Sequence, residues 1–219
     1  MSSKILVLPG DGIGVEVADQ AIRVIDKLNT LGLDATYEKD LVGGASYDAN
    51  GEPLTSAVLE KAKQSDAILL GAVGGSQWDN VERSKRPEAG LLGLRKELEL
   101  FANLRPALVF EALASASTLK DEVVSNLDIM IVRELTGGVY FGQPRGIEDT
   151  AEGKKAIDTQ VYYDYEIDRI ARVAFDLARK RNNKVTSVEK ANVMETGVLW
   201  RQVVKETHED FSDVQLENM

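Results

Sequence analysis

The segment Lys4–Gly14, KILVLPGDGIG, decides the fold class of this 219-residue chain. The apolar run after Lys4 ends in a Pro-Gly-Asp-Gly turn, so it predicts a short buried strand followed by a tight turn. After the turn, apolar side chains recur at helical spacing, at Ala21, Ile22, Ile25 and Leu28. A strand, a turn and a helix in this order are typical of an α/β fold with a largely parallel sheet.

The same alternation recurs along the rest of the chain. Ala67–Val73 predicts a second strand, and the helix after it is expected to carry one apolar stripe, at Leu91, Leu94, Leu98 and Phe101. Further strands are predicted over 127–133, 139–141 and 184–188. Two more helices are expected to face inward, through Ile167, Ile170, Ala171, Ala174 and Leu177, and through Val193, Gly197, Trp200, Val204 and Phe211. We therefore expect parallel or mixed sheets flanked by helices.

The chain is predicted to form two domains. A boundary near residues 101 to 106 separates a first α/β domain, residues 1–102, from a second, residues 103–219. Residues 143–159 are rich in charge and glycine, and we interpret them as a loop or protruding arm without a core of its own. At Val214–Met219 the pattern leads into another strand with no closing helix behind it, so we expect the second domain to be incomplete.

Composition and charge exclude several classes of function. The 26 Lys and Arg against 36 Asp and Glu leave a formal charge of −10, which repels nucleic acid and anionic membrane surfaces. No run approaches the roughly 20 apolar residues of a membrane span. The chain has no Cys, which excludes disulfides and Cys nucleophiles and favours a cytoplasmic location. The single histidine, His208, is predicted on a solvated helix face, so acid–base chemistry falls to Lys, Tyr or carboxylates.

The glycine-rich turn at Gly10–Gly14 admits two interpretations. It follows a strand, as a dinucleotide-binding loop does, but its spacing is G-x-G-x-G where that loop has G-x-G-x-x-G. The ribose-binding acid expected about 20 residues further on is not clearly placed. The alternative is that the glycines serve only a tight turn between strand and helix. The spacing alone leaves both interpretations open.

Three arginines stand outside simple charge runs. Arg95 lies between leucines of a helix, Arg105 precedes a proline, and Arg133 ends an apolar strand. A guanidinium at the rim of a core needs an anionic partner, and several together would suit a small di- or tricarboxylate. The alternative is three separate structural ion pairs.

Tyr140 and Lys190 are further candidates, each with a plain alternative. Tyr140 lies in an aromatic segment after the turn at Gly137 and Gly138, which we expect to be flexible, and a tyrosine in such a strand usually packs with its hydroxyl at the surface. Lys190 lies between a predicted strand and a helix, where a lysine drawn into a cleft can serve as a base. The alternative for Lys190 is a solvated surface lysine.

Five segments are informative as an ordered set of motifs: LPGDGIG (8–14), LLGAVGG (69–75), RPEAGLLGLRKELELFANLRP (86–106), VRELTGGVYFGQPRG (132–146) and KANVMETGVLWR (190–201). In this order they resemble the isocitrate/isopropylmalate dehydrogenase family of β-decarboxylating dehydrogenases, and most closely its isopropylmalate branch. The resemblance covers the whole chain. Several motifs in the correct order are far more specific than any one of them.

This resemblance implies an oxidoreductase that uses NAD to oxidise and decarboxylate 3-isopropylmalate to 4-methyl-2-oxopentanoate in leucine biosynthesis. It implies substrate binding by Arg95, Arg105, Arg133 and Asn192. Lys190 would act as general base on the C2 hydroxyl, and Tyr140 would supply a proton after CO2 leaves. A Mg or Mn ion would polarise the C2 oxygen.

The resemblance also assigns the cofactor and the substrate side chain. NAD would lie along the loop 75–88 and near the first helix, contacting Ile13, Gly74, Gly75, Ser76 and Glu88. This way of holding NAD accounts for the altered glycine spacing. Leu91 and Leu92, beside Arg95, would form an apolar pocket for an isopropyl group, where an isocitrate enzyme needs a small hydroxyl side chain or a cation.

Departures from the family pattern are modest within the chain. Val15 stands where proline is usual, Ser76-Gln77 where Pro-Lys is common, Tyr47 where isoleucine occurs, and Glu189 where aspartate precedes the lysine. Family members continue past residue 219 into the aspartates that bind the metal, so no metal ligand is assigned within residues 1–219. We expect an N-terminal portion that is inactive alone. The family is homodimeric, with an arm near residues 139–160 and with the lysine at position 190 reaching into the partner's site.

Two alternatives remain beside this interpretation. One is a sister β-decarboxylating dehydrogenase that acts on D-malate, tartrate or homoisocitrate. The other is a non-catalytic protein that binds a dicarboxylate or dimerises.

Overall fold

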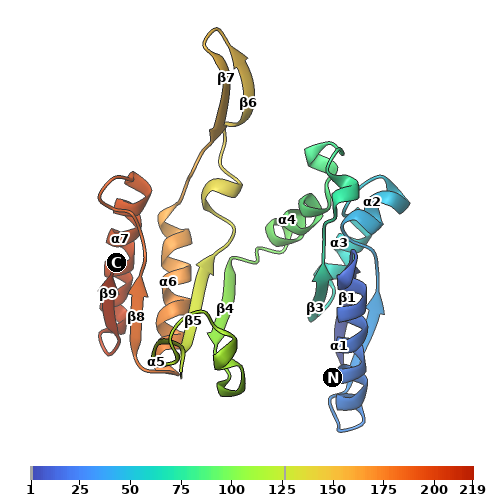
Figure 1. The fold of residues 1–219 in the computed structure, drawn as a ribbon, viewed down its shortest axis with the longest axis horizontal. Coiled ribbons are helices and arrows are strands. Elements are labelled where there is room, and N and C mark those ends of the chain that lie inside the picture. Colours follow the sequence, from blue (N-terminus) through green and yellow to red (C-terminus); the bar gives the residue numbers. More distant parts are fainter. Residues whose placement is uncertain (1, 126) are drawn as a thin grey trace. The chain divides into compact units, whose positions relative to one another are not determined.

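The computed structural model describes residues 2–125 and 127–219, and they form two compact units that are adjacent in sequence at Glu99 and Leu100. Figure 1 shows the elements of both units. Each unit is described by itself.

The first unit is built on a parallel sheet with the strand order β2-β1-β3, composed of β1 (Ser3–Gly10), β2 (Ala35–Lys39) and β3 (Ala67–Ala72). Its helices are α1 (Ile13–Asn29), α2 (Gly44–Asn50), α3 (Ser56–Lys63) and α4 (Pro87–Glu97). In β1, Leu6 and Leu8 pack in one cluster with side chains of α3 and α4, whereas Val7 packs against α1. Helices therefore cover both faces of the central strand, which explains its unbroken apolar run.

The glycine-rich turn brings α1 very close to the sheet. A Cβ added at Gly14 would lie 2.3 Å from the carbonyl oxygen of Pro9 and 2.4 Å from the backbone nitrogen of Ala72. Only glycine permits that approach between helix and strand. The buried stripe of α1 consists of Gly14, Ala18 and Ile22, whereas Leu28, expected in the core, is 42% exposed.

The helix after β3 is shorter than its apolar pattern predicted. α4 ends at Glu97, and Glu99 adopts a left-handed conformation with φ of 51°, which an α-helix cannot continue. The buried residues of α4 are Pro87, Gly90 and Leu94. Leu98, the C-cap, still packs against the same core as Leu94, whereas Phe101 lies beyond the helix, so the predicted four-residue stripe was wrong at Phe101.

The second unit contains three pairs of strands and two long helices. β4 (Ala102–Leu108) and β5 (Asp128–Glu134) are antiparallel, as are β6 (Arg145–Thr150) and β7 (Gly153–Asp158), while β8 (Lys184–Ser187) and β9 (Gln215–Asn218) are parallel. The helices are α5 (Asp121–Val124), α6 (Asp164–Arg179) and α7 (Glu195–His208). The core of the unit lies between α6 and α7 and includes Ile167, Phe175, Val204 and Phe211.

Two local predictions for this unit were wrong, and a third was right about the arm but not about its strands. Residues 139–141 do not form a strand, because Gly138–Tyr140 is a 3-10 helix. The preceding turn is not a free hinge, because Gly137 and Gly138 are both buried. The segment 143–159 is a protruding arm without a core, as predicted, but it consists mostly of the β6–β7 strand pair, which extends as a hairpin in Figure 1. Its side chains are almost all exposed, so only cross-strand pairing holds it together.

His208 is not on a solvated helix face. Its ring lies 5.4 Å from the ring of Phe175, and its Nε2 donates a hydrogen bond of 2.6 Å to the carbonyl oxygen of Val214. The histidine therefore ties the end of α7 to the chain that enters β9. Among the described residues, no helix is long and apolar enough to cross a bilayer.

α6 and α7 are also joined by a polar contact at Asp168. Its carboxylate accepts hydrogen bonds of 2.9 Å from Nε of Arg172 and from Oγ1 of Thr207 on α7. The bond from Arg172 lowers the pKa of Asp168 from its ordinary value of 3.8, burial opposes this, and the bond from Thr207 lowers the pKa further.

This contact predicts a pH-dependent contribution to stability. Because the folded pKa of Asp168 lies below the unfolded one, its contribution is complete above about pH 4 and is lost as the pH falls through the folded pKa. Asp168→Asn is expected to lower the free energy of unfolding by less than about 1 kcal/mol near neutral pH, since the pair is partly solvated. Urea denaturation of the parent and of Asp168→Asn, near neutral pH and at about pH 3, measures the difference in the free energy of unfolding at each pH. An equal difference from the parent at both pH values would contradict the prediction.

Candidate functional site

The carboxyl-terminal edge of the parallel sheet is organised by Asp11. Its side chain is buried and accepts backbone N–H bonds from Gly44 at 2.8 Å, from Ala45 at 2.7 Å and from Gly74 at 2.8 Å. These donors come from the start of α2 and from the loop after β3. One carboxylate therefore joins three loops at the edge where ligands of parallel α/β sheets bind. Asp11 was not among the residues predicted for this edge, although an acid at the end of a buried strand is a signal that the sequence shows.

The predicted cofactor residues lie along this edge. Ile13, at the first turn of α1, is 62% exposed, and Gly75 and Ser76 are exposed in the loop after β3. A Cβ added at Gly74 would lie 3.0 Å from Oε1 of Glu88, so the loop and the start of α4 are in close proximity. These groups leave an accessible rim of backbone and small side chains, which suits an extended ligand such as a dinucleotide.

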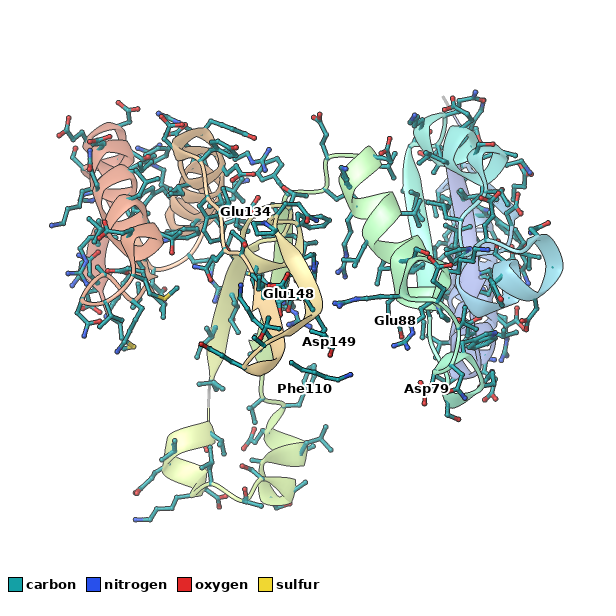
Figure 2. All side chains as sticks on the ribbon, turned by 90° about the horizontal axis from the view of Figure 1, so that it is seen from above. Asp79, Glu88, Phe110, Glu134, Glu148 and Asp149 are labelled. Atoms are coloured by element: carbon teal, nitrogen blue, oxygen red, sulfur yellow. The ribbon has the colours of Figure 1, made fainter. Side chains whose placement is uncertain are left out.

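The loop 75–88 is held firmly at its base. Trp78 is 7% exposed, and its Nε1 donates a hydrogen bond of 3.0 Å to Asp48 in α2. Arg86 donates to the carbonyl oxygens of Val81 and Asp79, at 3.0 and 2.6 Å. Figure 2 labels Asp79 in this loop and Glu88 at the start of α4. The buried tryptophan and the arginine thus give the exposed part of the loop a defined shape.

Glu88, Leu91, Leu92 and Arg95 share one side of α4, because they are spaced by three, four and seven residues. Leu91, Leu92 and Arg95 are half-buried, while Leu94 on the adjacent stripe enters the core. The two leucines therefore lie next to Arg95 along one side of α4.

Arg133 and Tyr140 are in direct contact in the second unit. The guanidinium carbon of Arg133 lies 5.3 Å from the centre of the Tyr140 ring. Arg105 shares a face with Arg133: Arg105 pairs with Ile131 and Asn103 pairs with Arg133, and directly opposed residues of an antiparallel pair point to one side. Two cations and a phenol are thus gathered on one face of the β4–β5 ribbon.

Glu134 supports this group from the opposite face of β5. Its side chain, 1% exposed, accepts the N–H of Gly137 at 2.6 Å, the hydroxyl of Thr136 at 3.0 Å and a bond from Arg169 of α6 at 2.9 Å. Figure 2 labels Glu134. The buried carboxylate fixes the turn between Arg133 and Tyr140. Sequence reasoning missed this role, because nothing local distinguishes Glu134 from an exposed strand end.

Tyr162 packs against the same turn. Burial raises the pKa of its hydroxyl, the negative charge of Glu134 raises it further, the Arg133 cation lowers it, and Glu166 and Tyr140 raise it.

Lys190 lies in the segment between β8 and α7. Lys190 and Asn192 are exposed, and within the described part of the chain the Lys190 ammonium forms no hydrogen bond or ion pair. The structure therefore does not join Lys190 directly to Arg133 or Tyr140.

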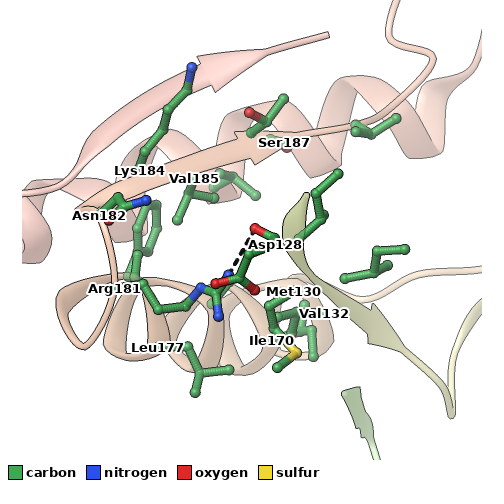
Figure 3. A pocket seen from close by; sticks show the side chains of 18 of the residues that line it. Asp128, Met130, Val132, Ile170, Leu177, Arg181, Asn182, Lys184, Val185 and Ser187 are labelled. Atoms are coloured by element: carbon green, nitrogen blue, oxygen red, sulfur yellow. Dashed lines mark hydrogen bonds and ion pairs between the residues drawn. The ribbon is translucent and has the colours of Figure 1, made fainter. Parts of the chain in front are cut away.

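A cavity of about 520 Å³ lies elsewhere in the second unit, between β5, α6 and β8. Figure 3 shows Met130, Val132, Ile170 and Val185 around it, with the Asp128–Arg181 ion pair of 2.7 Å at one side. Its lining is mainly apolar and includes none of the predicted site residues. The two cationic side chains of its lining, Arg181 and Lys184, are paired with Asp128 and Glu217, so the cavity does not resemble a dicarboxylate site. Within residues 2–125 and 127–219, no three His, Cys, Asp or Glu side chains are grouped as a metal site.

The model of the isocitrate/isopropylmalate dehydrogenase family matches residues 4–219. The chain belongs to this family. It is 63% identical over 218 residues to a 3-isopropylmalate dehydrogenase of Rhodopseudomonas palustris, covering 98% of this chain and 59% of the relative. It is 57% identical over 220 residues to one of Chromohalobacter salexigens, covering 100% of this chain and 61% of the relative. The chain thus spans about three fifths of the length of these relatives.

Solved structures of the family agree with the fold. An isocitrate dehydrogenase from Methylococcus capsulatus matches with a TM-score of 0.78 and 30% identity over 99% of this chain and 60% of that chain. A β-decarboxylating dehydrogenase from Thermococcus kodakarensis matches with a TM-score of 0.72 and 30% identity, over 99% and 57%. The α/β fold expected for the family is confirmed.

The role of Asp11 in this family member can be tested by Asp11→Asn. The asparagine oxygen can accept only part of the three N–H bonds, and its own N–H2 faces a donor, so we expect a loss of about 1–3 kcal/mol in the free energy of unfolding. Urea denaturation measures the loss. Asp26→Asn, at an exposed position of α1, is the matched control and should leave stability nearly unchanged. Equal stability of the two variants would refute a linking role for Asp11.

Proposed function

We propose that this chain contributes the cofactor edge, the carboxylate-binding arginines and two proton-transfer groups of a 3-isopropylmalate dehydrogenase of leucine biosynthesis. The reaction oxidises the C2 hydroxyl with NAD, releases the β-carboxylate as CO2 and yields 4-methyl-2-oxopentanoate. One observation carries the proposal: the chain is 57 to 63% identical, over essentially all its length, to proteins named 3-isopropylmalate dehydrogenase. The motifs that contain its candidate residues lie within this matched length.

Arg105 and Arg133 are proposed to bind substrate carboxylates. Their common face on the β4–β5 ribbon supports this, because two guanidinium groups that are close together favour a ligand with more than one negative charge. Arg95 is proposed as a further carboxylate ligand, and Asn192 as a polar substrate contact. Binding of this kind orients the C2–C3 bond and contributes to the rate by positioning.

Lys190 and Tyr140 are proposed to move the protons. Lys190 takes the proton of the C2 hydroxyl as hydride leaves C2. After CO2 is lost, Tyr140 donates its hydroxyl proton to C3 of the enolate, which gives the 2-oxo acid product and leaves a tyrosinate. The contact of Tyr140 with Arg133 supports this role, because a guanidinium against the ring stabilises the negative charge that remains after the transfer.

NAD is proposed to lie along the edge organised by Asp11, with Ile13, Gly74, Gly75, Ser76 and Glu88 as its contacts. The exposed rim there and the firm base of the loop fit an extended cofactor. When bound, NAD supplies the hydride acceptor. Mg or Mn is proposed as the metal, with ligands outside residues 1–219, because family members carry their metal-binding aspartates beyond the part that this chain matches.

Leu91 and Leu92 are proposed to select the substrate side chain. Their half-buried position beside Arg95 supports an apolar pocket that favours an isopropyl group over a third carboxylate. We also propose a cytoplasmic homodimer. The exposed β6–β7 hairpin, with Ile147 76% exposed, is the segment proposed to contact the partner.

The substrate assignment is tested in a chimaera. Residues 1–219 of this chain replace the matched part of the Rhodopseudomonas palustris relative, and NADH formation is followed with 3-isopropylmalate, D-malate and isocitrate. We expect 3-isopropylmalate to give the highest kcat/KM. Leu91→Ser and Leu92→Ser are expected to lower it by about 1–3 kcal/mol of transition-state binding, because the apolar pocket is lost. A preference for D-malate in a folded chimaera would refute the assignment.

The roles of the two proton-transfer groups are tested separately. Tyr140→Phe is expected to retain oxidation better than decarboxylation, because only the later step needs its hydroxyl, whereas Lys190→Met is expected to lower oxidation itself by about 100-fold or more. Single-turnover measurements of NADH and of released CO2 distinguish the steps. Equal loss of both steps in Tyr140→Phe would argue against an acid role for Tyr140.

A further inference from the structure

The segment that carries Lys190 is held by side chains of α7. The side chain of Glu189, 3% exposed, forms an ion pair with Arg201 and accepts a hydrogen bond of 3.3 Å from Oγ of Ser187. The same Ser187 oxygen accepts a hydrogen bond of 3.1 Å from Nε1 of Trp200. The side chain of Lys190 is exposed and is not held by a hydrogen bond or ion pair to any residue that the structure describes. Its position therefore depends on the backbone at residues 187–189.

Gly197 brings the first turn of α7 against the backbone of Lys190. A Cβ at Gly197 would lie 2.6 Å from the carbonyl carbon of Lys190 and 2.7 Å from the nitrogen of Ala191. The carbonyl oxygen of Lys190 also accepts the N–H of Met194 at 3.0 Å. The backbone of Lys190 therefore follows any displacement of α7.

The turn that carries Tyr140 is held by the segment 160–162. The N–H of Gly138 donates a hydrogen bond of 2.8 Å to the carbonyl oxygen of Val161. A Cβ at Gly138 would lie 2.5 Å from the hydroxyl oxygen of Tyr162, so only glycine allows the ring of Tyr162 to pack on this turn. The turn thus follows the position of Tyr162.

Two contacts join these supports to one another. The rings of Tyr162 and Trp200 meet edge to face, with centroids 5.4 Å apart and planes at 73°. Nε2 of Gln160 donates a hydrogen bond of 2.8 Å to Oγ1 of Thr196 on α7. Both rings pack against the core between α6 and α7, which limits their movement.

We propose that Tyr162 and Trp200 are positioning residues that form one aromatic frame. The frame fixes the position of the turn that carries Tyr140 relative to the segment that carries Lys190 in the same chain. The inference rests on the proposed function for the roles of Tyr140 and Lys190. Tyr162 acts through the Tyr140 turn, and Trp200 acts through Ser187 and Glu189. In a homodimer where Lys190 serves the partner's site, this frame connects a proton donor of one site to a base of the other.

If the aromatic frame holds the two segments, the distance between positions 140 and 190 should be well defined, and this distance can be measured in the 219-residue protein. The chain has no Cys, so Tyr140→Cys and Lys190→Cys together provide the only two attachment points for nitroxide labels. Double electron–electron resonance, with labelled protein diluted in unlabelled protein, records the distance distribution within one chain. We expect a single narrow distance distribution in the labelled protein without further substitutions. The distribution should be broader when Trp200→Phe or Gln160→Ala is added, and broadest when both are present.

Trp200→Phe is the milder variant, because it keeps an aromatic ring while it removes the N–H donor to Ser187 and the five-membered part of the indole. Tyr163→Phe is the matched control, because Tyr163 is adjacent to Tyr162 but 58% exposed. It should leave the distribution unchanged. A distribution that stays narrow in both Trp200→Phe and Gln160→Ala would overturn the frame.

The catalytic consequence is measured in the active chimaera. Trp200→Phe is expected to lower kcat by about 10- to 100-fold, because a small misplacement of a reacting group has that effect, while KM stays within about twofold. A merely structural role would lower the amount of active enzyme and the melting temperature together, so active-site titration separates the two. A broadened distribution with unchanged kcat would overturn the positioning role. Absence of isopropylmalate turnover in the unsubstituted chimaera would refute the proposed function and leave the distance measurement readable.

Discussion

The buried carboxylate of Asp11, bound by three backbone N–H groups, is the constraint on which the cofactor edge of the first unit depends. A carboxylate without partners is costly to bury, so these loops must keep the donors in place. The loops that surround the carboxyl ends of β1 and β3 are thereby fixed without a ligand. An edge prepared in this way loses little entropy when it binds an extended molecule.

The second unit also contains a buried carboxylate that holds a turn, that of Glu134. Its carboxylate accepts a backbone N–H and a hydroxyl within the turn before Tyr140, and Arg169 supplies the countercharge. Arg169 is itself enclosed by aromatic rings, with Phe101 4.6 Å and Tyr165 5.4 Å from its guanidinium carbon. Because the charge is paired and bonded to backbone, burial shapes the chain instead of destabilising it. The half-buried Arg133 and the exposed Tyr140 flank the turn that this buried carboxylate holds.

The two proton-transfer candidates illustrate the difference between a reacting group and its support. Tyr140 and Lys190 are exposed, as groups that meet a ligand must be, whereas Glu134 and Glu189 behind them are nearly inaccessible. Exposed side chains have many rotamers, so their positions depend on the backbone below them. The backbone is held in place by buried acids, by close contacts at glycines and by the Tyr162–Trp200 ring pair.

Local pattern alone determined the strand–turn–helix order, the α/β class and the family motifs, because apolar periodicity and turn residues act over a few neighbours. The sequence could not show that α4 ends at Glu97, that residues 138–140 form a 3-10 helix, or that His208 is partly buried against Phe175. It also missed Asp11 and Glu134 as organising groups. Only the tertiary structure decided these points, because burial, hydrogen-bond partners and close backbone approach arise between residues far apart in the chain.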